Sequence, residues 1–181
     1  MDDKDIVALY FDRNETAITQ TQLHYGTYCH SIAESILGNA HDAEECVNDT
    51  YLAAWRSIPP QKPGILRTYL GKLTRNIAIN RLRASKRQKR NPEFLLSLDE
   101  LSACIPAPEE QETGHLTALL NEFLMLTDPL DRKLFVGRYW YGRAVKTLAE
   151  GYGMTPNAVS IRLSRTRDKL KSFLEERGYQ P

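Results

Sequence analysis

The stretch "AVKTLAEGYGMTPNAVSIRLSRTRDKL", residues 144–170, has the pattern of two helices joined by a tight turn. Gly153 stands where a left-handed residue commonly ends a helix. Thr155 and Pro156 then supply the N-cap and the first position of the next helix. The first helix carries its apolar residues on one side, at Ala144, Val145, Leu148, Ala149 and Tyr152. This spacing predicts a helix-turn-helix.

The second helix of this stretch is predicted to have two different sides. Its inward side is formed by Val159, Leu163, Thr166, Leu170 and Leu174. Its outward side carries Asn157, Ile161, Ser164 and Arg165, with Ser160 at the edge. Arg162 and Lys169 flank the apolar stripe on one side and Arg167 flanks it on the other, placed to reach phosphates. Small polar residues beside arginines suit insertion into a major groove, so the pattern favours a DNA-reading helix over a packing helix with a basic back.

A helical pattern also precedes this stretch. Apolar residues recur at helical spacing at Leu116, Leu119, Leu120, Phe123 and Leu124. A further helix should then begin with Asp128 as N-cap, Pro129 at its first position and Asp131 in the first turn, where acids are favoured. We therefore expect a C-terminal helical domain over residues 115–181.

The first half of the chain is also predicted to be helical. One helix is indicated by Ile18, Tyr25, Cys29, Ile32 and Ile36, and it ends at Gly38 and Asn39. A second helix should start at Asp42, with Glu45 as its capping-box partner. Its core side holds Val47, Tyr51, Ala54, Trp55 and Ile58, and its outward side holds Asp42, Glu45, Asp49, Leu52 and Arg56. A leucine among acids leaves two readings of this outward side, a solvated face or a protein-docking face.

A loop at residues 59–64 separates this helix from a basic one. The basic helix has a core stripe of Leu66, Leu70, Leu73 and Ile77. A second stripe, interrupted by Ile79, contains Lys72, Asn76, Arg83, Arg87 and Arg90. With no acid in the segment to pair with it, this stripe indicates an anionic partner, and its amides suit base edges. Because the opposite side resembles a protein core, a membrane-surface helix is the less favoured alternative.

The charge is distributed in blocks along the chain although the net charge is only +1. Residues 1–64 hold 4 basic and 10 acidic side chains, and residues 65–91 hold 9 basic and no acidic ones. Residues 92–131 hold 9 acidic and no basic ones, and residues 132–177 hold 11 basic and 4 acidic ones. Two separate basic blocks predict two contacts with a polyanion. The acidic, proline-containing residues 91–114 are expected to form a mostly extended linker. The expected fold is thus all-α, with two small helical domains, residues 1–90 and 115–181, on either side of this linker.

The sequence contains no pattern for catalysis or metal binding. The 3 cysteines include no CxxC pair, and the 4 histidines have no ligand spacing with them. No phosphate-binding loop, nucleophile elbow or zinc-protease motif is present. We therefore predict no enzyme activity, no catalytic residue, no metal and no cofactor. No apolar run is long enough to span a membrane, and the acidic start has no signal-peptide core, which predicts a cytoplasmic protein.

Three segments, in this order, resemble the extracytoplasmic-function sigma factors of bacterial RNA polymerase. "AHDAEECVNDTYLAAW" (40–55) resembles their core-polymerase-binding segment, and "YLGKLTRNIAINRLRASKR" (69–87) resembles the segment that binds and opens the promoter −10 element. "YWYGRAVKTLAEGYGMTPNAVSIRLSRTRDKL" (139–170) is similar to the helix-turn-helix that binds the −35 element. The resemblance covers nearly the whole chain.

The resemblance implies three sets of contact residues and a set of partners. The contacts with core polymerase would be Asp42, Glu45, Asn48, Asp49 and Leu52. The −10 contacts would be Lys72, Arg75, Asn76, Asn80, Arg83, Lys86 and Arg87, and the loop 59–64 would hold an extruded base. The −35 contacts would be Thr155, Asn157, Ser160, Ile161, Arg162, Ser164 and Arg165. The implied partners are core RNA polymerase, promoter DNA and an anti-sigma factor, with no membrane insertion.

Four positions depart from the family pattern. Tyr69 stands where the family often has Trp, and Asn80 where it often has an acid. Gly151, inside the first helix of the helix-turn-helix, should cost about 1 kcal/mol relative to Ala. Ile161 replaces a residue that is usually small and polar, and an apolar side chain there suits contact with a thymine methyl, which predicts an unusual −35 sequence.

Three functions remain in competition. The first is a sigma factor that binds core polymerase and directs promoter recognition and opening. The second is a stand-alone helix-turn-helix regulator whose N-terminal domain dimerises or binds a ligand. The third is a membrane- or RNA-associated adaptor that uses the basic stripe. Two basic blocks favour the sigma factor, because a regulator needs only one.

Overall fold

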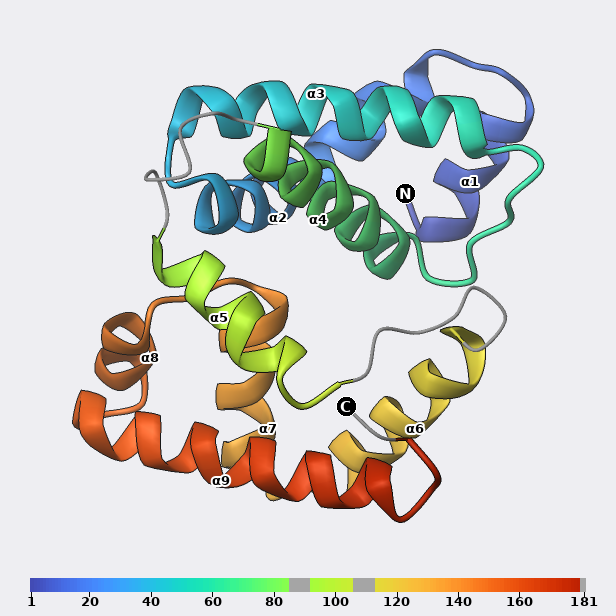
Figure 1. The fold of residues 1–181 in the computed structure, drawn as a ribbon. Helices are drawn as coiled ribbons and strands as arrows, with labels where there is room; N and C mark the ends of the chain where they lie inside the picture. The colour runs from blue at the N-terminus through green and yellow to red at the C-terminus, as the bar shows by residue number, and fades with distance from the viewer. Residues whose placement is uncertain (85–91, 106–112, 180–181) are drawn as a thin grey trace. The chain divides into compact units, whose positions relative to one another are not determined.

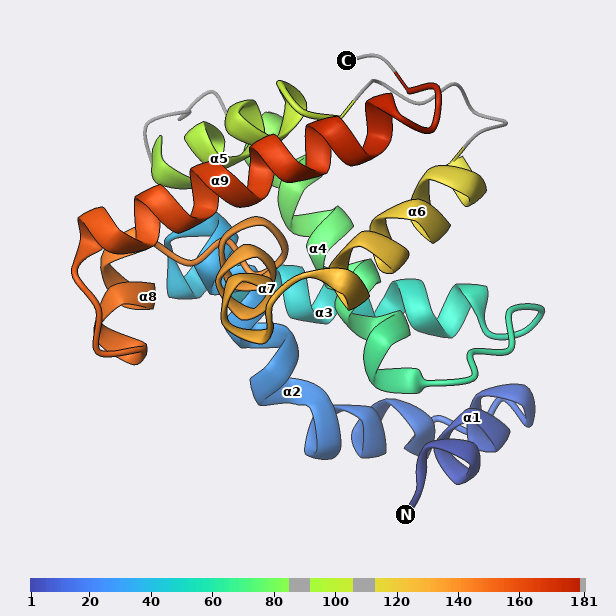
Figure 2. The same cartoon turned by 90° about the horizontal axis from the view of Figure 1, so that it is seen from below.

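The computed structural model describes residues 1–84, 92–105 and 113–179, and all regular secondary structure in these ranges is helical (Figures 1 and 2). The chain divides into two compact units, Met1–Asn91 and Pro92–Pro181. The all-α expectation is confirmed. None of the helices in the described ranges has the length and apolar character needed to cross a membrane.

The first unit contains α1 (Asp3–Phe11), α2 (Thr16–Leu37), α3 (Ala40–Ser57) and α4 (Leu66–Ala84). Helices α2, α3 and α4 pack against one another in pairs, and α1 packs on α2 and α4. The predicted end of α2 is confirmed, because Gly38 adopts a left-handed φ of 67°. The predicted start of α3 is wrong: Asn39 is the N-cap, and its side chain accepts a hydrogen bond from the Asp42 backbone N–H. Asp42 therefore lies in the first helical turn, where its charge favours the helix N-terminus.

Helix α4 is anchored at its start and buries a face slightly rotated from the predicted one. The Leu66 backbone N–H donates to the Asp3 carboxylate over 3.0 Å, which ties α4 to α1. The predicted core residues Leu73 and Ile77 are only half-buried. The buried residues of α4 are Leu66, Leu70, Gly71, Thr74, Ala78 and Leu82. Gly71 lies on this buried side and lets α2 approach closely, because a Cβ atom there would lie 2.5 Å from the Tyr28 hydroxyl oxygen.

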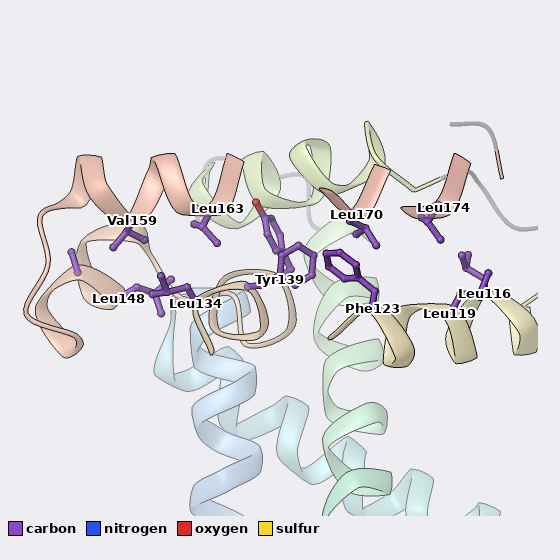
Figure 3. Close-up of a cluster of buried hydrophobic side chains, with 12 residues drawn as sticks. Leu116, Leu119, Phe123, Leu134, Tyr139, Leu148, Val159, Leu163, Leu170 and Leu174 are labelled. Carbon is purple, nitrogen blue, oxygen red and sulfur yellow. The ribbon is translucent and has the colours of Figure 1, made fainter. Parts of the chain in front are cut away.

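The second unit is built around one apolar cluster (Figure 3). Its described elements are α5 (Pro92–Ser102), α6 (Thr113–Leu126), α7 (Pro129–Phe135), the π-helical turn η1 (Val136–Trp140), α8 (Val145–Gly151) and α9 (Pro156–Glu175). The predicted start of α7 is confirmed, since the Asp128 side chain accepts from the backbone N–H groups of Leu130 and Asp131. The cluster contains Leu116, Leu119 and Phe123 of α6, Leu134 and Phe135 of α7, Tyr139, Leu148 and Ala149, and Val159, Leu163, Leu170 and Leu174 of α9.

Helix α5 corrects the expectation of an extended linker. Residues 92–102 are helical, with Pro92 at the helix start, where its missing N–H costs nothing. Leu101 and Ile105 pack against the apolar cluster of the second unit. Composition misled the prediction, because Pro92 is the first residue of this helix and Pro106 and Pro108 come after its end in the sequence. The remainder of the predicted linker, residues 106–112, lies outside the described residues.

Candidate nucleic-acid interfaces

The helix-turn-helix pattern of the sequence corresponds to α8, a short turn and α9. Gly153 adopts a φ of 63° in the turn, and the Met154 backbone N–H donates to the Ala149 carbonyl over 2.8 Å. The Thr155 hydroxyl oxygen accepts from the Ala158 backbone N–H, and Pro156 is the first residue of α9. The predicted turn and caps are therefore confirmed, and α9 begins at Pro156 as the sequence predicts.

Helix α9 has the two sides that its sequence predicts. The five predicted inward residues, Val159, Leu163, Thr166, Leu170 and Leu174, are the buried residues of the helix. Asn157, Ser160, Ile161 and Arg165 are exposed, and Ser164 is half-buried. Ile161 has 44% of its surface exposed. The N-terminal half of α9 thus presents short polar side chains, one isoleucine and one arginine to solvent.

Two of the flanking arginines are held by acids or a tyrosine of the same unit. Arg162 forms an ion pair with Asp131 of α7 over 2.6 Å, and this partner raises the pKa of its guanidinium. Arg167 donates to the Tyr139 hydroxyl over 2.6 Å and pairs with Glu100 of α5 over 3.2 Å. The sequence-based placement of Arg167 for phosphate contact is therefore wrong for this structure, because the side chain points to α5 and η1. Lys169, in contrast, is exposed.

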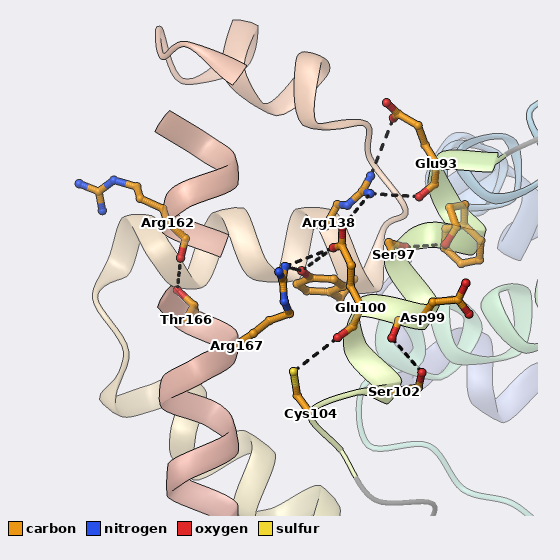
Figure 4. A network of polar contacts seen from close by, with 12 residues as sticks. Glu93, Ser97, Asp99, Glu100, Ser102, Cys104, Arg138, Arg162, Thr166 and Arg167 are labelled. Carbon is orange, nitrogen blue, oxygen red and sulfur yellow. Dashed lines mark hydrogen bonds and ion pairs between the residues drawn. The ribbon is translucent and has the colours of Figure 1, made fainter. Parts of the chain in front are cut away.

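A buried polar network explains why Arg167 turns inward (Figure 4). Arg138 has only 2% of its side chain exposed and donates to the backbone carbonyls of Glu93 and Arg143. The Glu100 carboxylate lies 4.0 Å from this guanidinium and accepts a hydrogen bond from the Tyr139 hydroxyl over 3.0 Å. Burial is the main cause that raises the pKa of Tyr139, so its hydroxyl stays a proton donor. The network fastens α5 to η1 and α9, and the sequence patterns had not singled out Glu100, Arg138 or Tyr139 for this role.

The basic side of α4 is largely open to solvent. Lys72, Asn76, Asn80 and Arg83 are exposed, as a surface for an anionic strand requires. Arg75 is half-buried, and burial lowers the pKa of its guanidinium to about 10. The remaining predicted contacts, Lys86 and Arg87, and the stripe residue Arg90 lie outside the described residues.

The acidic side of α3 is engaged by an arginine of α4. Glu45, Asn48 and Leu52 are exposed and Asp42 and Asp49 are half-buried. Arg81 pairs with Glu45 over 2.9 Å and with Asp49 over 2.5 Å. Arg81 is not a member of the predicted basic stripe, and the acids that pair with it come from the neighbouring helix. A count within one segment could not reveal this contact.

The loop after α3 lines a hollow on the first unit. Residues 58–65 contain no helix, which confirms the predicted loop at 59–64. Lys62, Pro63 and Gly64 line one side of a hollow of about 670 Å³, and α1 residues that include Asp3, Lys4 and Phe11 line the other. The walls of this hollow combine charged and apolar side chains.

The described residues contain no cluster of three or more His, Cys, Asp or Glu side chains that would hold a metal ion. The three cysteines, Cys29, Cys46 and Cys104, are buried and unpaired in disulfides. Burial is the main cause that raises the pKa of each thiol, to about 12 for Cys46. Their surroundings therefore suit packing rather than nucleophilic chemistry.

Sequence comparison places residues 23–88 in a match to the family described as Sigma-70 region 2. These residues run from α2 through α4 and so include the acidic face of α3 and the basic face of α4.

Several named relatives match over more of the chain. RNA polymerase sigma factor CnrH of Cupriavidus metallidurans is 27% identical over 183 residues, covering 96% of this chain and 94% of that protein. RNA polymerase sigma factor NccH of Alcaligenes xylosoxydans xylosoxydans is 26% identical over 141 residues, covering 74% of each protein. ECF RNA polymerase sigma factor SigE of Mycolicibacterium smegmatis is 27% identical over 146 residues, and the match covers 79% of this chain and 56% of that protein.

Two solved structures are similar at lower levels. CnrH in complex with the cytosolic domain of CnrY has a TM-score of 0.44 and 21% identity, covering 96% of this chain and 97% of that one. The sigma factor RpoE in complex with the anti-sigma factor NepR from Bartonella quintana has a TM-score of 0.36 and 21% identity, and the match covers 87% of this chain and 96% of that one.

Proposed function

We propose that the chain is an extracytoplasmic-function sigma factor of the sigma-70-like family, and that it joins core RNA polymerase and selects promoters at two points. The match of residues 23–88 to region 2 carries this proposal, because it falls on the helices that bear the acidic and basic faces. That match also disfavours a stand-alone regulator, whose N-terminal domain would instead dimerise or bind a ligand. The proposed role needs no chemistry by the chain itself, and it places the protein with its DNA template in the cytoplasm.

The outward side of α3 is proposed to contact the polymerase. It combines carboxylates with Leu52, which has 44% of its surface exposed. An exposed apolar side chain ringed by charge has the composition of a docking surface with a small desolvated centre. The proposed contacts are Asp42, Glu45, Asn48, Asp49 and Leu52.

The basic side of α4 and the adjoining loop are proposed to hold the opened −10 strand. Lysine and arginine neutralise phosphates, and exposed amides form hydrogen bonds with base edges. The hollow beside Lys62 and Pro63 offers room for an extruded base, whose unstacking costs a few kcal/mol. The proposed contacts are Lys72, Asn76, Asn80 and Arg83, with Lys86 and Arg87 beyond the described range and Arg75 as a partly buried member.

The exposed N-terminal half of α9 is proposed to enter the major groove of the −35 element. Thr155 caps the helix by accepting a hydrogen bond from the Ala158 backbone N–H, and the positive end of the helix dipole at this terminus suits a nearby phosphate. Asn157, Ser160, Ser164 and Arg165 supply donors and acceptors for base edges. Arg162 is proposed as a phosphate contact that Asp131 holds in place.

An anti-sigma factor is the proposed regulatory partner. The sigma factor RpoE is solved in complex with the anti-sigma factor NepR, and CnrH is solved in complex with the cytosolic domain of CnrY. The acidic face of α3 and the basic face of α4 offer it surfaces that polymerase and DNA would otherwise occupy.

A transcription assay tests the proposed function directly. The full chain is mixed with sigma-free core polymerase and supercoiled DNA that carries promoters mapped in cells, and specific transcripts are measured. We expect transcripts only when both proteins are present. Tight DNA binding by the chain alone, with no association with core polymerase, would show that the sigma-factor proposal is wrong.

Charge reversal on α3 tests the proposed polymerase contact. Asp49→Lys should weaken core binding, whereas Glu44→Lys, an exposed acid outside the predicted face of the same helix, should not. Because Asp49→Lys also breaks the pair with Arg81, Arg81→Met serves as the second control. If Arg81→Met reduces core binding as much as Asp49→Lys does, the loss comes from the broken ion pair and the proposed contact fails.

A further inference from the structure

Ile161 is the apolar residue that α9 directs away from its own core. At about 100° per residue, it lies about 180° from the mean direction of the buried stripe that runs from Val159 to Leu174. It has 44% of its surface exposed although β-branched aliphatic residues are usually buried. Ile161 is therefore available to contact a partner that binds the outward side of the second turn of α9.

The neighbours of Ile161 leave its side chain accessible. Ser160 and Ser164 are short, and Asn157 and Arg165 stand one turn before it and one turn after it. The exposed Arg165 and Lys169 give this surface positive charge, which complements a phosphate backbone. The outward side of α9 therefore has one apolar side chain, Ile161, surrounded by hydrogen-bonding and cationic groups. Such a surface is complementary to a polar groove that offers one apolar contact.

The major groove of DNA offers such a contact at one base only. Its edges display donors and acceptors at every base pair, and the C5 methyl group of thymine is the apolar exception. An isoleucine has no hydrogen bond to give, so it gains free energy only by removing apolar surface from water. Contact with guanine or cytosine edges would instead leave their polar atoms facing a methyl group.

We propose that Ile161 determines promoter specificity by contacting the C5 methyl group of one thymine in the −35 element. The inference rests on the proposed function, because it assigns a role to one residue of the proposed −35 surface. It differs from hydrogen-bond readout in that the methyl group is recognised rather than the Watson–Crick identity of the base. A 5-methylcytosine at the same strand position carries the same methyl group and should recover part of the binding lost with cytosine.

The experiment uses the complete holoenzyme and a promoter duplex selected by it from a random −35 pool. Each thymine of the selected element is replaced singly by uracil, which removes only the methyl group and keeps every hydrogen-bonding group. With the wild-type chain, one position should lose about fourfold in affinity, the effect of one buried methyl-sized group. With Ile161→Ser the loss at that position should disappear, while Ile161→Val should keep most of it.

Arg165→Ala provides the matched control, since it weakens base contacts on the same surface without removing the isoleucine. The uracil effect should survive in this variant. Equal uracil effects for the wild-type chain and Ile161→Ser overturn the proposal, and so does a selected element without a thymine at the positions that the holoenzyme protects. Failure of the holoenzyme to select any duplex would instead overturn the proposed function, so the two failures are distinguishable. Circular dichroism verifies that each variant retains its helices.

Discussion

Replacing Leu163 by alanine should destabilise the second unit far more than the same change two residues earlier at Ile161. Leu163 has 2% of its surface exposed and belongs to the apolar cluster, whereas Ile161 has 44% exposed. Because both residues lie in α9 and are aliphatic and of equal size, the comparison isolates the side of the helix on which each stands. The expected difference comes from burial rather than from helix propensity.

The magnitude follows from the carbon atoms that each change removes. Leu163→Ala deletes three buried carbons at about 0.8 kcal/mol each, and the cavity left behind raises the cost to about 3 kcal/mol. Ile161→Ala removes a side chain that is already largely hydrated, and alanine recovers several tenths of a kcal/mol of helix propensity. Its net cost should be below about 0.5 kcal/mol. For a unit of this size, 3 kcal/mol corresponds to a fall in Tm of roughly 12–24 °C.

The measurement combines thermal unfolding with hydrogen exchange on the full chain. Circular dichroism reports the fall in Tm, and exchange in peptides from α9 assigns it to the second unit rather than to the first. Equal losses for the two variants, or a loss below about 1 kcal/mol for Leu163→Ala, would contradict the two-sided structure of α9. The proposed contact between Ile161 and DNA would then fail as well.

Three further perturbations test separate features. Arg165→Ala should weaken binding to particular −35 bases by about 1–3 kcal/mol, whereas Arg162→Ala should weaken binding to all sequences alike. The measurement is the affinity of each variant for a panel of promoters that differ by single bases. If the two variants lose affinity identically across the panel, the assignment is incorrect. Glu100→Gln should lower the free energy of unfolding by about 1–2 kcal/mol, because it removes the charge that faces two arginines. Urea titrations measure this loss, and Asp99→Asn is the exposed control. Equal urea midpoints for the two variants would contradict the network. Burial raises the pKa of Cys46 from 9.0 to about 12, so native protein at pH 8 should resist iodoacetamide while unfolded protein reacts. Because the unfolded state loses the thiol proton first, the contribution of this group to stability should fall as pH rises from about 9 to about 12, and a stability that is flat over this range would contradict its burial.

The local features of the second unit could be predicted because short-range chemistry determines them. The Asp128 and Thr155 caps, the Gly153 turn and the buried stripe of α9 depend on residues within one or two helical turns of each other. Helical periodicity assigns such a stripe without knowledge of its partner. The structure confirmed these predictions at the level of single residues.

Contacts between distant segments could not be predicted in the same way. The sequence analysis did not predict α5, because the proline and acid content of this eleven-residue segment was given more weight than the helical spacing of its apolar residues. Glu100 meets Arg167 across 67 positions of the chain, and Arg81 meets Asp49 across 32. Charge blocks indicated that acids and bases were available, but they contained no information about which pairs the packing of helices brings together.

The pairing of Arg81 with the α3 acids is compatible with the proposed docking of polymerase at those acids. The side chains of Glu45 and Asp49 are 55% and 48% exposed, and that of Arg81 is 32% exposed. Ion pairs with this exposure contribute about 0–1 kcal/mol to stability, because water solvates and salt screens both charges when the pair opens. A polymerase cation can therefore replace Arg81 at little cost. The Arg81→Met variant should therefore still bind core polymerase, and a loss of core binding as large as that of Asp49→Lys would contradict this exchange of partners.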